Sequence, residues 1–250
     1  MTIWQAVILG AVQGITEFFP ISSSGHLVVL QSLFGLKESL AFDVFLHLGT
    51  LASILIYFRK DIAALLKDIK SVLLMIAASI PTAIIGFSFK DAVEKFFGMP
   101  NLVGYMLMLT GLVLLAASLY NKFMAPRREL GFINSIIIGI AQGIAVMPGI
   151  SRSGATIGIG ILCGLDKEKA FKFSFLLAIP AILGASILQL HKIVQGIAGK
   201  DAICFFAGGL VAMVVGLAAI KILLNALIRN KLYIFGLYCI LAGTLIIIFI

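Results

Sequence analysis

One stretch of the chain, GAVQGITEFFPISSSGH from Gly10 to His26, decides the fold because it occurs twice. The second copy reads GIAQGIAVMPGISRSG and runs from Gly139 to Gly154. The offset between the two copies is constant, since 142 − 13, 143 − 14, 151 − 22 and 154 − 25 all equal 129. Polar and ionisable side chains interrupt otherwise apolar sequence in both copies. The chain is therefore predicted to contain a long internal repeat.

The composition places the chain among membrane proteins. The 250 residues are 61% hydrophobic and 12% charged, with a mean hydropathy of +1.15. Soluble domains average about 45–50% apolar and about 25% charged residues. We therefore expect an all-α polytopic membrane protein. The net charge of +8 does not indicate nucleic-acid binding, because no long basic run occurs. Cys163, Cys204 and Cys239 lie in apolar runs and are predicted to be small core residues.

Six apolar runs are long enough to cross a membrane as helices, which takes about 20 residues. They are residues 40–58, 71–89, 102–120, 170–190, 202–224 and 232–250. Two further apolar regions, 3–34 and 132–164, are interrupted by proline, glycine and serine. Broken backbone at membrane depth occurs only where protein or a polar cavity surrounds it. Both regions are therefore predicted to be re-entrant helical hairpins with serine-rich tips.

Lysine and arginine predict the orientation, because cytoplasmic loops carry an excess of both. Residues 59–70, 121–131, 164–169 and 225–231 hold eleven of them: Arg59, Lys60, Lys67, Lys70, Lys122, Arg127, Arg128, Lys167, Lys169, Arg229 and Lys231. The opposite side holds five: Lys37, Lys90, Lys95, Lys192 and Lys200. The first group is predicted to be cytoplasmic, with both termini outside and the two hairpins entering from opposite sides.

Opposite entry makes the chain an inverted-topology repeat within one membrane domain, with halves of about 1–125 and 126–250. Such repeats usually bind their ligand near mid-membrane, where the two halves meet. The repeat continues beyond the tips, because Asp43 aligns with Lys172 at the same offset. An ion pair between these two residues is one interpretation. Two unrelated charges at helix ends are the other.

Three ionisable residues, Glu17, His26 and Arg152, lie within the broken hairpins. Such groups cost at least about 2.5–3.5 kcal/mol each at the centre of a spanning helix and indicate function by default. A purely structural Glu17–Arg152 pair is the alternative, but it leaves His26 and the serines unexplained. Gln13 lies one helical turn before Glu17, so both side chains share one helix face. His47 lacks such neighbours in the sequence and is predicted to be a hydrogen-bonded structural histidine.

Each tip is predicted to bind phosphate, because a helix start offers unpaired N–H groups and a partial positive charge. The first tip provides hydroxyl and backbone donors at Ser22, Ser23, Ser24 and Gly25. The second provides Ser151, Arg152, Ser153 and Gly154, with Thr156 one turn after the arginine. An arginine fork binds phosphate in a bidentate way. Two such tips on opposed hairpins predict a site for one phosphate-bearing lipid.

The differences between the copies predict a division of roles. Glu17 aligns with Val146, and His26 aligns with Ala155, so only the first copy holds an acid and an imidazole. These groups suit proton transfer and activation of a nucleophile. Arg152 of the second copy suits stabilisation of charge on a transferring phosphoryl group. A carrier of anions would gain little from Glu17, which repels an anionic substrate unless it is protonated or bound to a metal.

The motifs QGITEFFPISSSGH and PGISRSGAT resemble the signatures of the undecaprenyl-diphosphate phosphatase family, also called the bacitracin-resistance family. The resemblance covers the whole chain and includes FDVFLHLGT from Phe42 and FSFLLAIP from Phe173. It implies six spanning helices and two re-entrant hairpins in the cell membrane, with the site open to the outer face. It also implies removal of the terminal phosphate of undecaprenyl diphosphate, which recycles the carrier lipid for peptidoglycan and other envelope polymers.

The resemblance further implies that Ser23, His26 and Arg152 are the essential serine, histidine and arginine. It implies a divalent cation, Mg²⁺ or Ca²⁺, near Glu17. The family's acidic motif has Glu or Gln four residues before its second Glu, and Gln13 leaves one carboxylate fewer for a metal. Ser23 or His26 would attack the terminal phosphorus or activate water to do so, and the sequence does not choose. Glu17 would orient His26 or bind the metal.

The alternative function is a secondary transporter or flippase of an anionic prenyl-phosphate lipid, since inverted repeats with broken helices are typical of transporters. Phosphate release separates the two functions. A purely structural scaffold would not explain three ionisable groups within the membrane. Besides the lipid substrate and the bilayer, the sequence leaves a homodimer open as a partner.

Overall fold

The computed structural model describes the chain except for residues 37–38, 90–99, 125–128, 199–201 and 250. The described residues form twelve helices and no strand. In chain order these are α1 (Ile3–Thr16), α2 (Ser23–Leu33), α3 (Leu40–Tyr57), α4 (Arg59–Lys67), α5 (Ile69–Ser88), α7 (Pro100–Phe123), α8 (Phe132–Ile144), α9 (Arg152–Leu162), α10 (Lys167–Leu188), α11 (Leu190–Ala198), α12 (Ala202–Ile228) and α13 (Leu232–Phe249). The described residues thus confirm that the fold is all-α.

Among the described residues, five helices are long and apolar enough to cross a membrane, namely α5, α7, α10, α12 and α13. The helices α3 and α4 form a sixth candidate, but they meet at an angle of 73°. The predicted span 40–58 therefore ends in a sharp bend at Phe58. The bend falls where charged residues begin, because Arg59, Lys60 and Asp61 follow directly, and α4 buries no residue.

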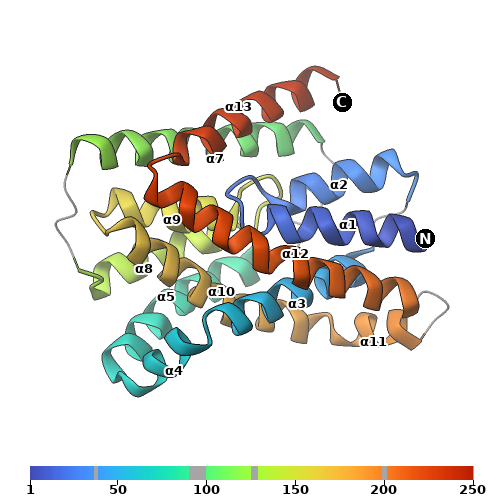
Figure 1. The fold of residues 1–250 in the computed structure, drawn as a ribbon, viewed down its shortest axis with the longest axis horizontal. Helices are drawn as coiled ribbons and strands as arrows, with labels where there is room; N and C mark the ends of the chain where they lie inside the picture. The colour runs from blue at the N-terminus through green and yellow to red at the C-terminus, as the bar shows by residue number, and fades with distance from the viewer. Residues whose placement is uncertain (37–38, 90–99, 125–128, 199–201, 250) are drawn as a thin grey trace.

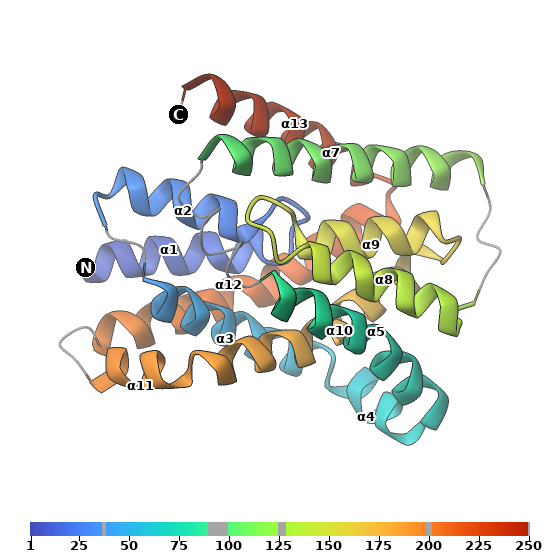
Figure 2. The ribbon, with the colours of Figure 1, turned by 180° about the vertical axis from the view of Figure 1, so that it is seen from behind.

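The helix bounds follow the sequence repeat. The helices α1 and α8 begin at Ile3 and Phe132, and 132 − 3 equals the offset of the motifs. The helices α2 and α9 begin at Ser23 and Arg152, and 152 − 23 gives the same value. Each short first helix packs against a long helix from the other copy, α1 against α12 and α8 against α5. The helices α7 and α13 lie side by side along one edge of the molecule (Figures 1 and 2).

Two glycines make the crossed packing possible. A Cβ atom at Gly10 of α1 would overlap the backbone carbonyl of Gly208 on α12. A Cβ atom at Gly139 of α8, its equivalent in the repeat, would overlap the carbonyl of Ala78 on α5. Small residues let membrane helices approach to backbone contact, which strengthens their van der Waals packing. Both short helices are thereby fixed along their long partners, and the tips that follow them are fixed as well.

Aromatic side chains fill the core beneath the tips. Phe18 of the first tip and Phe171 of α10 both pack against Phe175, with ring centroids 5.5 and 4.9 Å apart. Phe58, at the bend between α3 and α4, contacts the same ring at 6.0 Å. The Arg152 guanidinium carbon lies 5.6 Å from the centroid of Phe175. A cation over an aromatic face is attracted to it, so this core also supports the arginine.

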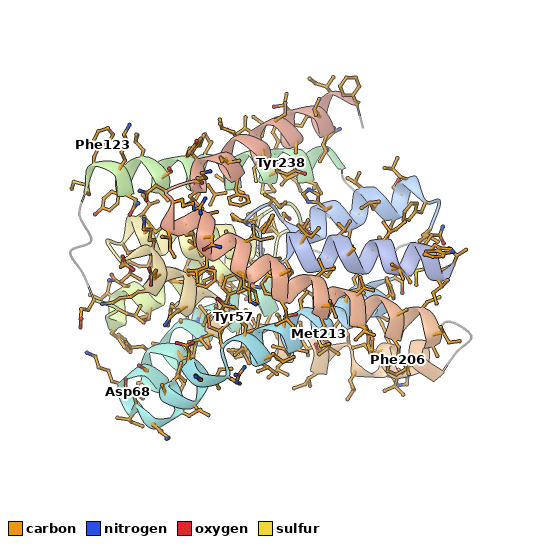
Figure 3. All side chains as sticks on the ribbon, in the orientation of Figure 1. Tyr57, Asp68, Phe123, Phe206, Met213 and Tyr238 are labelled. Carbon is orange, nitrogen blue, oxygen red and sulfur yellow. The ribbon has the colours of Figure 1, made fainter. Side chains whose placement is uncertain are left out.

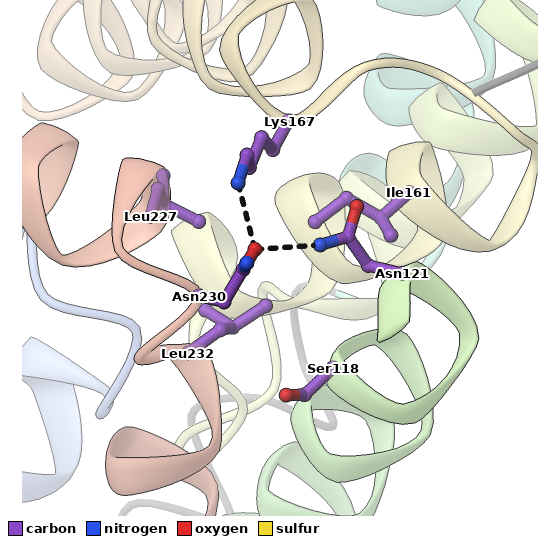
Figure 4. Close-up of a pocket in the computed structure, with 7 residues that line it drawn as sticks. All are labelled: Ser118, Asn121, Ile161, Lys167, Leu227, Asn230 and Leu232. Carbon is purple, nitrogen blue, oxygen red and sulfur yellow. Dashed lines mark hydrogen bonds between the residues drawn. The ribbon is translucent and has the colours of Figure 1, made fainter. Parts of the chain in front are cut away.

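The turn between α12 and α13 is held by Asn230 (Figure 4). Its Oδ1 accepts hydrogen bonds from Lys167 Nζ at 2.7 Å and from Asn121 Nδ2 at 2.9 Å. Lys167 Nζ also donates to the carbonyl oxygen of Ile228 at 3.0 Å. Asn230 has a left-handed φ of 55°, which asparagine tolerates better than most residues. One side chain thus joins this turn to α7 and to α10.

Replacing Asn230 by alanine is expected to destabilise the detergent-purified protein by about 1–3 kcal/mol, because it removes these hydrogen bonds and strains the turn. Asn230→Gly loses the same bonds but accepts the left-handed backbone. It is therefore expected to fall between the wild type and Asn230→Ala. Thermal denaturation measures both variants. Equal melting temperatures for wild type and Asn230→Ala would contradict this role.

Candidate active site

The two non-helical tips lie together in the middle of the molecule. Residues 17–22 join α1 to α2, and residues 145–151 join α8 to α9, and the two connections approach each other in both views (Figures 1 and 2). The first connection contacts the start of α9, because Ser153 Oγ donates a hydrogen bond to the carbonyl oxygen of Phe19 at 3.3 Å. Residues 134 positions apart in the sequence thus form one polar region.

Glu17 is the centre of this region and is 7% exposed. Its Oε1 accepts a hydrogen bond from Arg152 Nη2 at 2.5 Å. Its Oε2 accepts from Ser23 Oγ at 2.7 Å and from Gln13 Nε2 at 3.1 Å, and lies 3.3 Å from His47 Nε2. A buried carboxylate is stable only when it is paired and hydrogen-bonded. The structure therefore brings together Gln13, Glu17, Ser23 and Arg152, four of the residues that the sequence singles out.

His47 is a fifth member, and the expectation that it lacks an ionisable partner is wrong. Its Nδ1 lies 2.8 Å from the carbonyl oxygen of Asp43, and its Nε2 faces Glu17. Both ring nitrogens thus face acceptors, an arrangement that a doubly protonated imidazole satisfies. The contact arises because α3 packs against α1. The only sequence signal is that Asp43 and His47 lie one turn apart on the same helix face.

His26 faces a different partner from the one expected. Its Nδ1 lies 2.7 Å from the carbonyl oxygen of Ser22, and its Nε2 lies 2.7 Å from the hydroxyl of Tyr238 on α13. Both ring nitrogens are therefore engaged away from Glu17. The expectation that Glu17 orients His26 is wrong in this structure, where His47 is the histidine at the carboxylate. Tyr238 is missed by the sequence analysis, because it lies 212 residues from His26.

The first tip is strained where α2 begins. Ser22 has a φ of 67°, rare for a residue other than glycine, and its Oγ accepts a hydrogen bond from Gly25 N at 3.4 Å. Its hydroxyl also lies 3.3 Å from Ser24 Oγ. Such conformations cost on the order of 1–3 kcal/mol and cluster at functional sites. The equivalent residue of the second tip, Ser151, has an ordinary φ of −77°.

The second tip caps α9 in the same way without strain. Ser151 Oγ accepts from Gly154 N at 3.1 Å and lies 3.2 Å from Ser153 Oγ. Thr156, predicted to face phosphate, is fully buried. Its hydroxyl donates to the carbonyl oxygen of Arg152 at 2.8 Å and lies 2.5 Å from Ser174 Oγ. The structure thus places Thr156 behind the arginine, where it supports the first turn of α9.

Each tip is also braced by a long helix that belongs to the other copy. Thr110 Oγ1 of α7 accepts from Ser151 N at 3.0 Å and lies 3.5 Å from the carbonyl oxygen of Gly149. Cys239 Sγ of α13 lies 3.4 Å from the carbonyl oxygen of Pro20. These contacts are equivalent, since 239 − 110 and 149 − 20 both equal 129. The same device therefore holds both tips, and Cys239 is buried as predicted.

The ion pair suggested between Asp43 and Lys172 is not the one that the structure forms. Lys172 Nζ lies 2.9 Å from Asp61 Oδ1 on α4. Asp43 Oδ1 instead accepts a hydrogen bond from Gln31 Nε2 at 2.6 Å. The bend at Phe58 explains the difference, because it carries Asp61 to α10. Equivalent positions in the repeat are thus not paired with each other here.

The site contains one buried acceptor without a partner. Gln13 Oε1 has no hydrogen-bond partner among the residues that the structure describes, although Gln13 Nε2 donates to Glu17. Gln142, the equivalent residue of the second copy, has the same unpartnered Oε1, and its Nε2 donates to the carbonyl oxygen of Leu177 at 3.3 Å. Among the described residues, no group of three or more His, Cys, Asp or Glu side chains is arranged to hold a metal ion.

Comparison with known proteins gives consistent matches over the whole chain. Residues 6–245 match the family described as bacitracin resistance protein BacA. The undecaprenyl-diphosphatase of Carboxydothermus hydrogenoformans is 45% identical, over 99% of this chain and 97% of that protein. Proteins of the same name from Desulfosudis oleivorans and Methanosphaera stadtmanae are 41% and 39% identical, over 96% and 99% of this chain and 95% and 98% of their own lengths.

Proposed function

The chain belongs to the bacitracin resistance protein BacA family, and we propose that it is a membrane phosphatase. It hydrolyses undecaprenyl diphosphate to undecaprenyl phosphate and inorganic phosphate, the activity named for its relatives, and so recycles the carrier lipid. One observation in the site carries the proposal. A single buried carboxylate, Glu17, binds both a serine hydroxyl from one tip and an arginine from the other.

Ser23 is the nucleophile in this proposal. Its hydroxyl donates to Glu17 Oε2 at 2.7 Å, within the range in which a base activates a nucleophile. His47 and Gln13 hold the carboxylate from the other sides, as a third group does in hydrolase triads. His26 is less suited to attack phosphorus, because both of its ring nitrogens already have partners. The geometry thus favours Ser23 where the sequence leaves three alternatives open.

Arg152 changes partners when the substrate arrives. Without substrate its guanidinium neutralises Glu17, and its Nη1 lies 3.5 Å from the carbonyl oxygen of Ser174. A diphosphate between the two tips offers a stronger, multiply charged partner to the arginine fork. The helix starts of α2 and α9 add backbone donors on either side. As the arginine turns to phosphate, Glu17 loses its closest positive charge and becomes a better base for Ser23.

The reaction then takes two steps. Ser23 Oγ attacks the terminal phosphorus, its proton passes to Glu17, and the bond to the bridging oxygen breaks to release undecaprenyl phosphate. Water next attacks the phosphoserine and gives one proton to His26. Glu17 returns its proton to Ser23 Oγ as inorganic phosphate leaves, and His26 later loses its proton to solvent. Arg152 stabilises the charge of the transferring phosphoryl group in both steps.

The membrane arrangement proposed with this activity is an inverted repeat of six spans and two re-entrant hairpins, with halves of about 1–125 and 126–250. Both termini lie at the same end of the molecule, and α4 lies at the other end (Figures 1 and 2). The excess of lysine and arginine supports a cytoplasmic α4, with both termini outside. Six of the basic residues counted, Lys37, Lys90, Lys95, Arg127, Arg128 and Lys200, lie outside the described residues. The family implies a site open to the outer face.

The residues present do not fit a resident divalent cation. Mg²⁺ and Ca²⁺ require oxygen ligands, and Mg²⁺ is commonly held by one or two carboxylates together with substrate phosphates. In the part of the chain that the structure describes, the only carboxylate contacted by the tip serine and arginine is Glu17, and its oxygens face donors from Arg152, Ser23 and Gln13. We propose that the cation which the resemblance implies arrives on the diphosphate and is not held by the substrate-free protein.

Replacing Gln13 by glutamate is expected to create a cation site in the substrate-free protein. The change puts a second carboxylate beside Glu17, where the unpartnered Oε1 of Gln13 now lies. Calorimetric titration with Mg²⁺ or Ca²⁺ should detect binding to Gln13→Glu and none to the wild type. Gln142→Glu is the matched control, because its environment is equivalent but lacks the partner carboxylate. Stoichiometric binding to the wild type without substrate would contradict this proposal.

Release of inorganic phosphate from undecaprenyl or farnesyl diphosphate by detergent-purified protein tests the function itself. The assay is run with Mg²⁺ or Ca²⁺ and again with EDTA. Turnover establishes the phosphatase. A folded preparation that releases no phosphate but moves prenyl phosphate across liposomes would favour the transporter instead. The position of Glu17 argues against transport alone, because a carboxylate bound to a serine hydroxyl opposes anion binding and assists attack on phosphorus.

A further inference from the structure

Tyr238 is placed against the first tip by three neighbouring contacts from α13. Its hydroxyl lies 2.7 Å from His26 Nε2, and the two rings stack at 14° with centroids 5.8 Å apart. On the same helix, Cys239 contacts Pro20, and the Phe235 ring lies 5.2 Å from that of Phe19. Figure 3 shows Tyr238 on α13, above the central region where the tips meet. The tyrosine is therefore fixed relative to the histidine.

Comparison of the two copies shows that the Tyr238–His26 contact is not one of the contacts that support both tips. Thr110 and Cys239 are equivalent residues that brace the second and the first tip alike. At the same offset, Tyr238 aligns with Leu109 and His26 aligns with Ala155. A leucine and an alanine cannot make this hydrogen bond. The second tip is thus supported without a tyrosine–histidine pair. The pair occurs only at the first tip, which precedes Ser23.

The hydrogen bonds of His26 define what the tyrosine does. Because Nδ1 faces the carbonyl oxygen of Ser22, that nitrogen must carry a hydrogen. A neutral ring then has its lone pair on Nε2, and the Tyr238 hydroxyl is the donor that meets it. The pair fixes both the tautomer and the ring orientation. An imidazole held in this form takes the proton of the water that hydrolyses phosphoserine through the tyrosine: the water gives its proton to the Tyr238 oxygen as the hydroxyl proton passes to His26 Nε2.

We propose that Tyr238 is a proton relay for His26: its hydroxyl holds the imidazole in the Nδ1-protonated form and passes the proton of the attacking water to Nε2. Tyr238 does not touch the phosphorus and acts through the histidine. The inference rests on the proposed phosphatase function, because it assigns a partner to the base of the second step. It adds a residue from α13 to a site whose chemical groups otherwise come from the first tip and from α1, α2, α3 and α9.

A double-mutant cycle tests the proposal. Tyr238→Phe is expected to lower kcat about 10-fold and to leave KM within about two-fold, because proton transfer is impaired and substrate binding is not. In a His26→Ala background, the same change is expected to have no further effect. Tyr233→Phe, an exposed tyrosine on the same helix, is the control. A Tyr238→Phe loss of equal size in both backgrounds, or no loss in the wild type, would overturn the proposal.

A second measurement needs no turnover. Diethyl pyrocarbonate modifies the unprotonated nitrogen of histidine, and mass spectrometry resolves His26 from His47 and His191. Removing the Tyr238 hydroxyl is expected to speed modification of His26 several-fold, and Tyr238→Leu, which copies the equivalent residue Leu109 of α7, should do the same if Tyr238→Phe does not fold. Unchanged modification would refute the contact. A wild type without phosphatase activity would refute the proposed function and leave this contact testable.

Discussion

Replacing Ser23 by alanine is expected to reduce turnover on the order of 10⁴-fold or more, the scale at which hydrolases lose activity without their nucleophile. The variant should still fold. Within the described part of the chain, the half-buried Ser23 side chain makes one hydrogen bond, to Glu17, and the loss of such a bond typically costs about 1–3 kcal/mol. Steady-state phosphate release measures the effect. Ser32→Ala, at an exposed position on the same helix, is the matched control and should retain full activity.

Capture of the intermediate makes the test decisive. Rapid acid quenching of the wild type during turnover should yield a phosphopeptide that contains Ser23, and the alanine variant should yield none. Ser23→Ala with activity within about 10-fold of the wild type would remove Ser23 as the nucleophile and leave His26 or water. A phosphohistidine found at His26 would have the same consequence.

Exchanging Arg152 for lysine is expected to lower kcat/KM about 10²–10³-fold, as loss of a transition-state donor does elsewhere. Lysine keeps a positive charge near Glu17, so folding should be largely preserved. It lacks the planar fork and binds phosphate only as a point charge. It also loses the stacking on Phe175 and the bond from Nη1 to Ser174. Normal turnover by the lysine variant would show that the fork is not part of the site.

Arg152→Ala separates the chemical role of the arginine from its structural role. It leaves Glu17 buried without its guanidinium, and breaking a buried pair in this way costs about 3–5 kcal/mol. Alanine should therefore lower both thermal stability and activity, and lysine should lower mainly activity. Arg229→Lys, at an exposed arginine in the α12–α13 turn, is the control for the exchange. Equal stability losses in both Arg152 variants would contradict the distinction.

Much of the fold follows from the sequence, because apolar length and breaks in apolar runs are local properties. The interruptions at Pro20 and Pro148 predict where the two tips lie in the sequence. The constant offset between the copies aligns each residue of the second tip with a residue of the first. The bend at Phe58 is not predictable from hydropathy. Residues 59–67 are amphipathic. Only the contact with α10, through the Lys172–Asp61 ion pair, shows that α4 bends away from the direction of α3.

The site is predictable only in part, for a physical reason. Gln13, Glu17 and Ser23 lie close together in the sequence, and the repeat brings Arg152 to them from a known offset. His47 and Tyr238 enter through contacts between helices, α3 with α1 and α13 with the first tip. The spacing of Asp43 and His47 shows only that these two residues share a helix face, and neither contact between helices can be predicted from spacing or composition. The wrong assignment of His26 to Glu17 has the same origin. His47 is farther from Glu17 in the sequence than His26 is, but it is the histidine that contacts Glu17 in the structure.

The crossed packing of the short helices has a consequence for biosynthesis. The helix α1 ends at Thr16, but its partner α12 begins only at Ala202, in the last quarter of the chain. At about 5–20 residues per second, a ribosome needs roughly 10–40 s to make the stretch between them. During this interval the nascent first hairpin holds Glu17 and its serines without α12, and for most of it without Arg152. Chains truncated before α12 are therefore expected to leave the polar first hairpin without its packing partner and to be degraded early.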